Sequence, residues 1–158
     1  MASIELFLKG WVIMDERVLD HLKRLNQYRL RLLEMKQLTS EQFLRDDMRQ
    51  AAAERLLHLA IESCLNIGNR LVSLFQFDTP VGTPETYADV FKALHQIGVV
   101  DEEFSLRLVE MAKFRNRLVH AYWDLDKDTV YRILQNCTDD FLLFQEKTVS
   151  FLNKRPLG

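Results

Sequence analysis

The sequence predicts an all-α protein, an up-and-down bundle of about five helices. Apolar residues recur at helical spacing along nearly the whole chain, and no strand-like alternation persists. Only five glycines and three prolines occur in 158 residues, which leaves room for long uninterrupted helices. The length suits one domain, which we place at residues 14–154, preceded by an extra N-terminal segment at residues 1–13.

The first expected helix spans about residues 15–37. Its apolar stripe consists of Val18, Leu22, Leu25, Tyr28, Leu32 and Met35. A second long helix is expected at about residues 41–75, with Ser40 as its N-terminal cap. The second half of this helix is apolar on more than one side, which is typical of a helix at the centre of a bundle.

Small residues interrupt the apolar surface of this central helix at regular intervals. Ala60, Cys64 and Gly68 lie four positions apart and therefore share one face. A glycine inside a helix costs about 1 kcal/mol relative to alanine. Close approach of another helix would explain why a glycine stands at this position.

The segment QFDTPVGTPET, residues 76–86, breaks the helical pattern. We expect a short helix after it, capped by Thr83 and with Pro84 at its first position. Gly98 is the expected stop of this short helix.

The fourth helix is expected to start at Asp101, with two glutamates in its first turn. The last helix begins near Asp126 or Asp128. Its stripe consists of Val130, Ile133, Cys137, Phe141, Phe144 and Phe151. In both segments apolar residues recur every three or four positions, which predicts two more helices and completes the bundle.

Charge and cysteine content exclude several classes of protein. The formal net charge is −2, so the chain lacks the overall basic field of non-specific DNA-binding proteins. The two cysteines lie inside apolar helical patterns, which indicates buried thiols in a reducing, cytoplasmic environment. No apolar run is long enough to span a membrane, and no cysteine or histidine motif predicts a metal or cofactor.

The segment FRNRLVHAYWDLD, residues 114–126, combines polar and apolar residues in an unusual way. The apolar stripe of the fourth helix passes through Leu108, Ala112, Arg115, Val119 and Tyr122. Arg115 thus occupies a position where the period favours an apolar side chain. His120 follows Asn116 by one helical turn, so these two side chains can approach each other.

A buried guanidinium needs a partner, because it stays charged at any ordinary pH. Glu62 on the central helix is the nearest plausible acid, and Asn66 and Asn69 add polar groups nearby. One interpretation is purely structural: Arg115 pairs with Glu62, Asn116 bridges helices, and His120 closes a loop with Tyr122.

The functional interpretation uses the same residues to cleave a phosphodiester without a metal. His120 exchanges a proton near neutral pH, and Arg115 offers forked donors to a phosphate. RNA supplies its own nucleophile, the 2′-hydroxyl. Asn116 could orient His120 or the phosphate, and Tyr122 could bind phosphate or stack on a base.

The pattern R-x4-H-x-Y formed by Arg115, His120 and Tyr122 resembles the HEPN superfamily, specifically its HepT-like toxin branch. The segment AERLLHLAIESCLNIGNRLVS is similar to that branch's central helix, and the segment RNRLVHAYWDLDKDTVYRIL to its signature followed by the last helix. The resemblance covers roughly residues 14–150. In that branch an acid is more common than an asparagine at the position of Asn66.

The resemblance implies a homodimer in which two motif segments face each other across a cleft. It implies a metal-independent endoribonuclease acting by 2′-hydroxyl transesterification, with Arg115, Asn116 and His120 as catalytic residues. It also implies an MntA-like nucleotidyltransferase antitoxin that silences the toxin by transferring AMP to Tyr122. Glu62, Asn66 and Asp126 are supporting candidates.

Two other hypotheses stay open at this point. The chain could be a non-catalytic nucleotide-binding or regulatory partner of a nucleotidyltransferase, or a purely structural dimeric bundle. The latter would be favoured if Glu62 enclosed Arg115 with no cleft beside it.

Several other polar and aromatic residues have simpler interpretations. His21, His58 and His95 stand alone and are expected to be structural or solvent-facing. The basic run at residues 22–36 is best interpreted as a solvated helix face, and otherwise as a rim that steers RNA or the antitoxin. Trp11 and Trp123 are candidate interface anchors.

Overall fold

The computed structural model describes residues 15–120 and 125–154. These residues form six α-helices and no strand: α2 (Glu16–Lys36), α3 (Ser40–Leu44), α4 (Asp47–Phe75), α5 (Tyr87–Ile97), α6 (Glu102–His120) and α7 (Lys127–Lys154). The all-α prediction is confirmed. The expectations for residues 1–13, for Trp11, and for Tyr122 and Trp123 lie outside the described residues.

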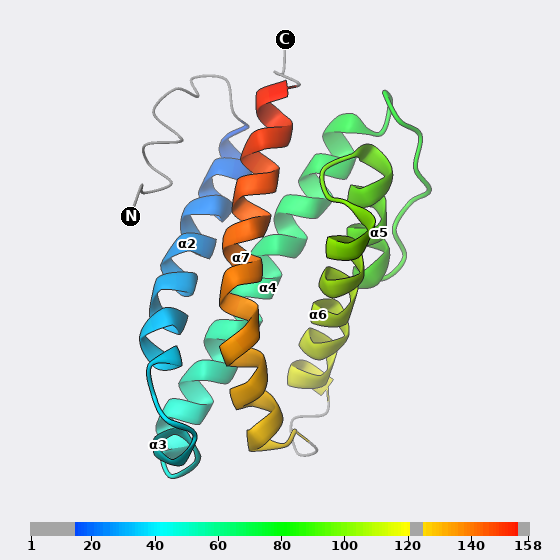
Figure 1. The fold of residues 1–158 in the computed structure, drawn as a ribbon. Helices are drawn as coiled ribbons and strands as arrows, with labels where there is room; N and C mark the ends of the chain where they lie inside the picture. Colours follow the sequence, from blue (N-terminus) through cyan, green and yellow to red (C-terminus); the bar gives the residue numbers. More distant parts are fainter. Residues whose placement is uncertain (1–14, 121–124, 155–158) are drawn as a thin grey trace.

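Helix α4 occupies the centre of the bundle, as the breadth of its apolar surface predicts (Figure 1). Helices α2 and α7 run beside it on one side, and α5 and α6 pack together on the other. The core between these helices is rich in fully buried aromatic and leucine side chains, among them Phe43, Phe91, Phe104, Phe141 and Phe144. Removal of these apolar side chains from water is the main source of the bundle's stability.

The second expected helix is in fact two helices, so the prediction of one helix capped by Ser40 is wrong. Thr39 caps the short α3, and its hydroxyl and the Gln42 side chain each accept a backbone N–H from the other residue. Asp46 then adopts an extended conformation and accepts a hydrogen bond from the Arg49 backbone N–H at 3.0 Å, which starts α4. Two strong N-caps within eight residues divide a segment that is apolar at helical spacing throughout.

Helix α5 starts three residues later than predicted, because Thr86 rather than Thr83 is its cap. The Thr86 hydroxyl accepts the Asp89 backbone N–H at 3.2 Å, and the Asp89 carboxylate accepts the Thr86 N–H at 3.0 Å. This reciprocal capping box stabilises a helix start at Tyr87 more than the fixed φ of Pro84 stabilises a start at residue 84. Gly98 ends α5 at a φ of 93°, in the left-handed region that favours glycine, as predicted.

Gly68 on α4 is the site of a close helix approach, which confirms the expectation from the small-residue spacing. A Cβ built on Gly68 would lie 2.7 Å from Cγ1 of Val90 on α5. Since a valine side chain is stiff, this contact leaves little room for a methyl group. The glycine thereby sets how closely α5, and Tyr87 at its start, approach α4.

Both predicted starts at aspartates are confirmed. The Asp101 carboxylate accepts the Phe104 backbone N–H at 2.8 Å before α6, and Asp126 accepts the Asp128 N–H at 3.2 Å before α7. On α6 the predicted stripe is only partly right, because Val119 is 36% exposed. None of the described helices is both long and apolar enough to cross a membrane.

Candidate active site

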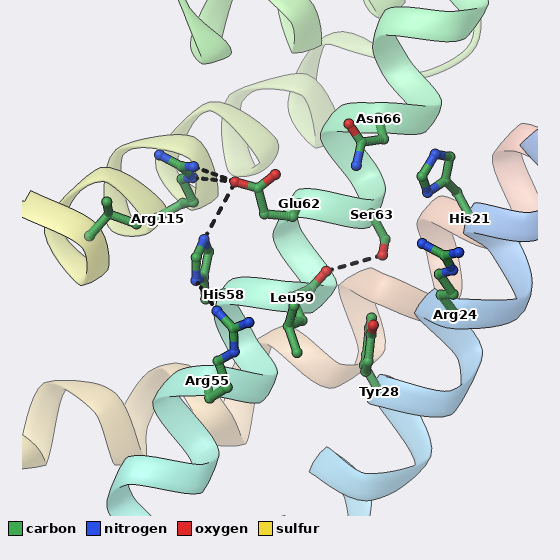
Figure 2. Close-up of a pocket in the computed structure, with 11 residues that line it drawn as sticks. His21, Arg24, Tyr28, Arg55, His58, Leu59, Glu62, Ser63, Asn66 and Arg115 are labelled. Atoms are coloured by element: carbon green, nitrogen blue, oxygen red, sulfur yellow. Dashed lines mark hydrogen bonds and ion pairs between the residues drawn. The ribbon is translucent and has the colours of Figure 1, made fainter. Parts of the chain in front are cut away.

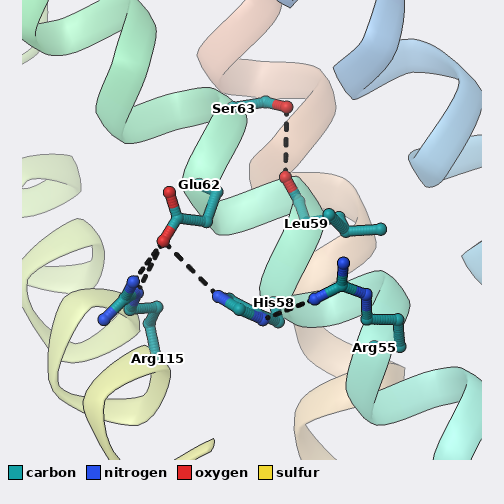
Figure 3. Close-up of polar contacts among 6 residues, drawn as sticks. All are labelled: Arg55, His58, Leu59, Glu62, Ser63 and Arg115. Carbon is teal, nitrogen blue, oxygen red and sulfur yellow. Dashed lines mark hydrogen bonds and ion pairs between the residues drawn. The ribbon is translucent and has the colours of Figure 1, made fainter. Parts of the chain in front are cut away.

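Arg115 lies against the central helix and pairs with Glu62, the acid that the sequence predicts. Its Nε donates to Glu62 Oε1 at 2.9 Å, and its Nη2 donates to the same oxygen (Figure 3). The residue is only 9% exposed. Nη1 makes no hydrogen bond to any residue that the structure describes, so one donor group of the fork is left for another acceptor.

The other face of the Arg115 guanidinium lies over an aromatic ring. Its central carbon is 4.5 Å from the centroid of Tyr87, the first residue of α5. A carboxylate at the edge and a ring at the face hold a planar cation in one orientation. The sequence offers no signal for Tyr87 as a site residue, because the contact depends on how α5 and α6 pack.

His58 and Arg55 extend the polar contacts along α4. Nε2 of His58 lies 3.4 Å from Glu62 Oε1, and Nδ1 of His58 lies 3.4 Å from Nη1 of Arg55 (Figure 3). Neither residue is predicted from the sequence as part of the site. Their spacing from Glu62 was a usable signal, since residues three or four apart meet on one helix face.

The pKa of the Glu62 carboxyl is lowered by these partners. Partial burial by itself raises the pKa, but the hydrogen bonds and positive charge of Arg115, with a smaller contribution from the nearby His58 ring, outweigh it. Glu62 is therefore ionised at neutral pH and keeps a negative charge next to Arg115. The ionised Glu62 carboxylate holds the guanidinium in place, and both groups keep their charge.

Arg115 also lines an open groove of about 360 Å³, which we call the α2–α4–α6 groove. Helix α4 forms its floor, and α2 and α6 lie on opposite sides of it (Figure 2). The lining residues are His21, Arg24, Tyr28, Arg55, His58, Leu59, Glu62, Ser63, Asn66, Arg115 and Val119. Because this groove lies beside it, Glu62 does not enclose Arg115 in the way that a purely structural role would favour.

His120 and Asn116 line a second cavity of about 560 Å³, the α4–α5–α6 cleft. Both side chains are exposed, and neither hydrogen-bonds to another described residue. The two residues share this cleft four positions apart on α6, and a direct contact between their side chains stays a prediction. The remaining lining residues are Asn69, Pro84, Glu85, Thr86, Tyr87 and Val90.

The predicted site residues are thus divided between two neighbouring cavities. Arg115, Glu62 and Asn66 line the groove, whereas Asn116 and His120 line the cleft. Tyr87 connects the two, because it lines the cleft and carries Arg115 on its ring.

Two candidates lie elsewhere. Asp126 caps α7 and lines neither cavity, and Tyr122 lies outside the described residues. Within residues 15–120 and 125–154, no group of three or more His, Cys, Asp or Glu side chains is arranged to hold a metal ion.

The chain is thus an all-helical bundle in which an Arg-Asn pair and, five residues after the arginine, a histidine lie on the last turns of α6. Residues 18–148 match the family model described as ribonuclease HepT-like, so the chain belongs to that family. Its sequence is 25% identical over 136 residues to the tRNA nuclease HepT of Aphanizomenon flos-aquae, covering 86% of this chain and 83% of that protein.

Two further similarities agree with this assignment. The chain is 30% identical over 103 residues to the mRNA nuclease HepT of Shewanella oneidensis, covering 65% of this chain and 74% of that protein. Its fold matches the tri-AMPylated Shewanella oneidensis HEPN toxin in complex with MNT antitoxin, with a TM-score of 0.77 at 24% identity over 87% of this chain and 99% of that one. The family-model match over residues 18–148 confirms the resemblance of the sequence to the HepT-like family.

Proposed function

We propose that this chain is the toxin of a toxin–antitoxin pair and that it cleaves RNA without a metal ion. Two relatives are named tRNA nuclease and mRNA nuclease, and both support an RNA substrate. The observation that carries the proposal is an exposed imidazole, His120, in a cleft whose Tyr87 wall holds the Arg115 guanidinium in place.

The reaction would be a transesterification within the RNA strand. His120 accepts the proton of a 2′-hydroxyl, the 2′-oxygen forms a bond to the adjacent phosphorus, and the bond from phosphorus to the 5′-oxygen breaks. The 5′-oxygen leaves with a proton, and the other product ends in a cyclic phosphate. Arg115 stabilises the negative charge that develops on the phosphate, and Asn116 orients the phosphate or His120.

We further propose that the active form is a homodimer. In one chain Arg115 and His120 line different cavities, and Arg115 offers only part of its donor fork outside Glu62. A second copy that brings its own α6 motif to the first would supply an additional imidazole and guanidinium. One histidine could then act as base while the other donates a proton to the leaving oxygen.

A nucleotidyltransferase antitoxin would silence this activity at Tyr122, two residues after His120. The tyrosine oxygen attacks the α-phosphorus of ATP, AMP is transferred and pyrophosphate leaves. The AMP adds negative charge and bulk near His120, which repels an RNA phosphate. The tri-AMPylated HEPN toxin bound to MNT antitoxin supports this regulation, and we expect the pair to act in the cytoplasm.

The test is an RNA cleavage assay in the presence of EDTA. We expect wild-type protein to cleave RNA, and His120→Ala to lower the cleavage rate by about 10²–10⁴-fold. The control is His95→Ala, because His95 is exposed on a helix and lines neither cavity; thermal unfolding is measured beside it, since the His95 ring lies 3.1 Å from the Val100 carbonyl oxygen. Equal cleavage by His120→Ala and wild type would reject the assigned site.

A second measurement separates catalysis from regulation. Intact-mass analysis after incubation with an MNT-type nucleotidyltransferase and ATP should show AMP on the wild type and none on Tyr122→Phe. AMP transfer by a protein that never cleaves RNA would instead favour the non-catalytic regulatory partner.

A further inference from the structure

The α2–α4–α6 groove collects positive charge on a protein that is acidic overall. Three arginines line it, Arg24, Arg55 and Arg115, against one carboxylate, Glu62. The chain as a whole has a formal net charge of −2. Such a concentration of charge in a concave surface raises the local potential and attracts anions.

Two of these arginines are free to meet a ligand. Arg24 and Arg55 are both exposed, and neither forms an ion pair with a described residue. Arg55 contacts only the ring nitrogen of His58, at 3.4 Å.

The groove is longer than a single anion needs. Along its floor, the lining residues of α4 run from Arg55 to Asn66, which is on the order of 16 Å at 1.5 Å per residue. Arg24 and His21 add cationic or ionisable groups from α2, across α4 from Arg115 (Figure 2). A ligand with repeated negative charges along its length matches this layout better than an isolated phosphate.

Neutral groups in the same groove suit the other parts of a nucleotide. Tyr28 offers an aromatic face, and base stacking on such a ring contributes about 1–3 kcal/mol. Asn66 is exposed and hydrogen-bonds to no described residue, so its amide is available to sugar hydroxyls or base edges.

The groove also reaches the proposed catalytic residues. Arg115 lines it directly, and the adjacent residues Val119 and His120 line the groove and the cleft respectively. A strand whose scissile phosphate lies between Arg115 and His120 would continue on one side into the groove.

We propose that the α2–α4–α6 groove binds the phosphodiester backbone of the RNA strand that flanks the cleavage position, with Arg24 and Arg55 as phosphate contacts. That this strand belongs to a substrate rests on the proposed function, the cleavage of RNA. It gives a role to Arg24 in the basic run of α2, whereas Arg29 of the same run is 6% exposed and points into the bundle.

The test is RNA binding measured by fluorescence anisotropy over a series of salt concentrations. The probe is a labelled single-stranded 2′-O-methyl RNA, which lacks the nucleophile and survives the proposed reaction. The variant is Arg24→Ala/Arg55→Ala, and the matched control is Arg132→Ala/Lys147→Ala, which removes two charges from α7 outside the groove.

We expect the groove variant to bind more weakly and to lose about 1.4 from the slope of log K against log salt, since each phosphate contact contributes about 0.7 on a single strand. The control should keep the wild-type slope. Unchanged binding by the groove variant would overturn the proposal. So would a loss of dimer in light scattering with an unchanged slope, because the groove would then contact protein.

Cleavage assays separate this proposal from the one on which it rests. If the wild type cleaves RNA but the groove variant binds normally, only the groove assignment fails. If the wild type does not cleave but the groove variant loses affinity and slope, the groove binds RNA and the nuclease proposal fails. Thermal unfolding should be the same for both double variants, because all four side chains lie at the surface or its edge.

Discussion

Arg115 and His120 lie five residues apart on one helix, yet their surroundings are opposite. Arg115 is 9% exposed and held by a carboxylate and an aromatic ring, whereas His120 is exposed and hydrogen-bonds to no described residue. The comparison shows two ways of presenting a functional group. Under the proposed function, the charge that would meet a phosphate is oriented in advance, and the group that would exchange a proton is left in contact with solvent.

Substituting each residue by alanine is the strongest test of this contrast. His120→Ala should lower cleavage by about 10²–10⁴-fold with an unchanged melting temperature, because removal of general acid–base catalysis costs that much and the side chain is exposed. Arg115→Ala should abolish cleavage and also lower stability. Activity assays and thermal unfolding on the same preparations would measure both. Equal destabilisation by the two substitutions would contradict the comparison.

The stability loss in Arg115→Ala comes from Glu62. Breaking a fully buried pair costs about 3–5 kcal/mol, and we expect about 1–3 kcal/mol here because the Glu62 side chain is 30% exposed and partly screened. Chemical denaturation gives the difference in the free energy of unfolding.

Two substitutions of Glu62 distinguish its role in orienting Arg115 from the effect of its negative charge. We expect Glu62→Ala to destabilise by about 1–3 kcal/mol, because it leaves Arg115 without its partner in a nearly buried position. Glu62→Gln keeps an acceptor of the same shape and should lose less stability. If Glu62 is a positioning residue, Gln should also recover part of the cleavage activity that Ala loses. Identical activity in the two variants would argue for a purely structural pair.

Tyr87 tests the other side of the guanidinium with a smaller expected effect. Tyr87→Ala should cost about 0.5–1 kcal/mol of stability, the usual size of an exposed cation–π contact, and should lower cleavage by releasing Arg115. Tyr87→Phe keeps the ring and should behave like the wild type in both measurements. A large loss in Tyr87→Phe would mean that the hydroxyl, rather than the ring, is required.

The smallest expected effect is a pH dependence of stability from Glu62. Its pKa is lowered in the folded protein from an ordinary value of 4.5, so the folded state binds fewer protons at this site than the unfolded state does. The stabilisation is therefore complete above pH 4.5 and is lost as the pH falls through the folded value. Thermal unfolding of Glu62→Gln should show a weaker decline over this acidic range than the wild type. A decline of equal size in both proteins would assign it to other carboxyls.

The sequence by itself predicts that the chain is helical, where most helices begin and end, and the pairing of Arg115 with Glu62. Periodicity and caps are local, and for that reason Asp15, Asp101 and Asp126 mark helix starts correctly and Gly98 marks a stop. The same local information identifies Arg115 as a polar residue in an apolar position, and Glu62 as the acid most able to accept it. The errors at Ser40 and Thr83 are also local, since several residues in each segment could cap a helix.

Only the tertiary structure decides which groups meet across helices. Arg115 and Glu62 are 53 residues apart, and Tyr87 meets the Arg115 guanidinium because α5 packs against α6. The division of the motif between a groove and a cleft likewise follows from how α2, α5 and α6 pack around α4. Hydrophobic burial is non-directional, so a helical period shows which face turns inward without stating what that face will touch.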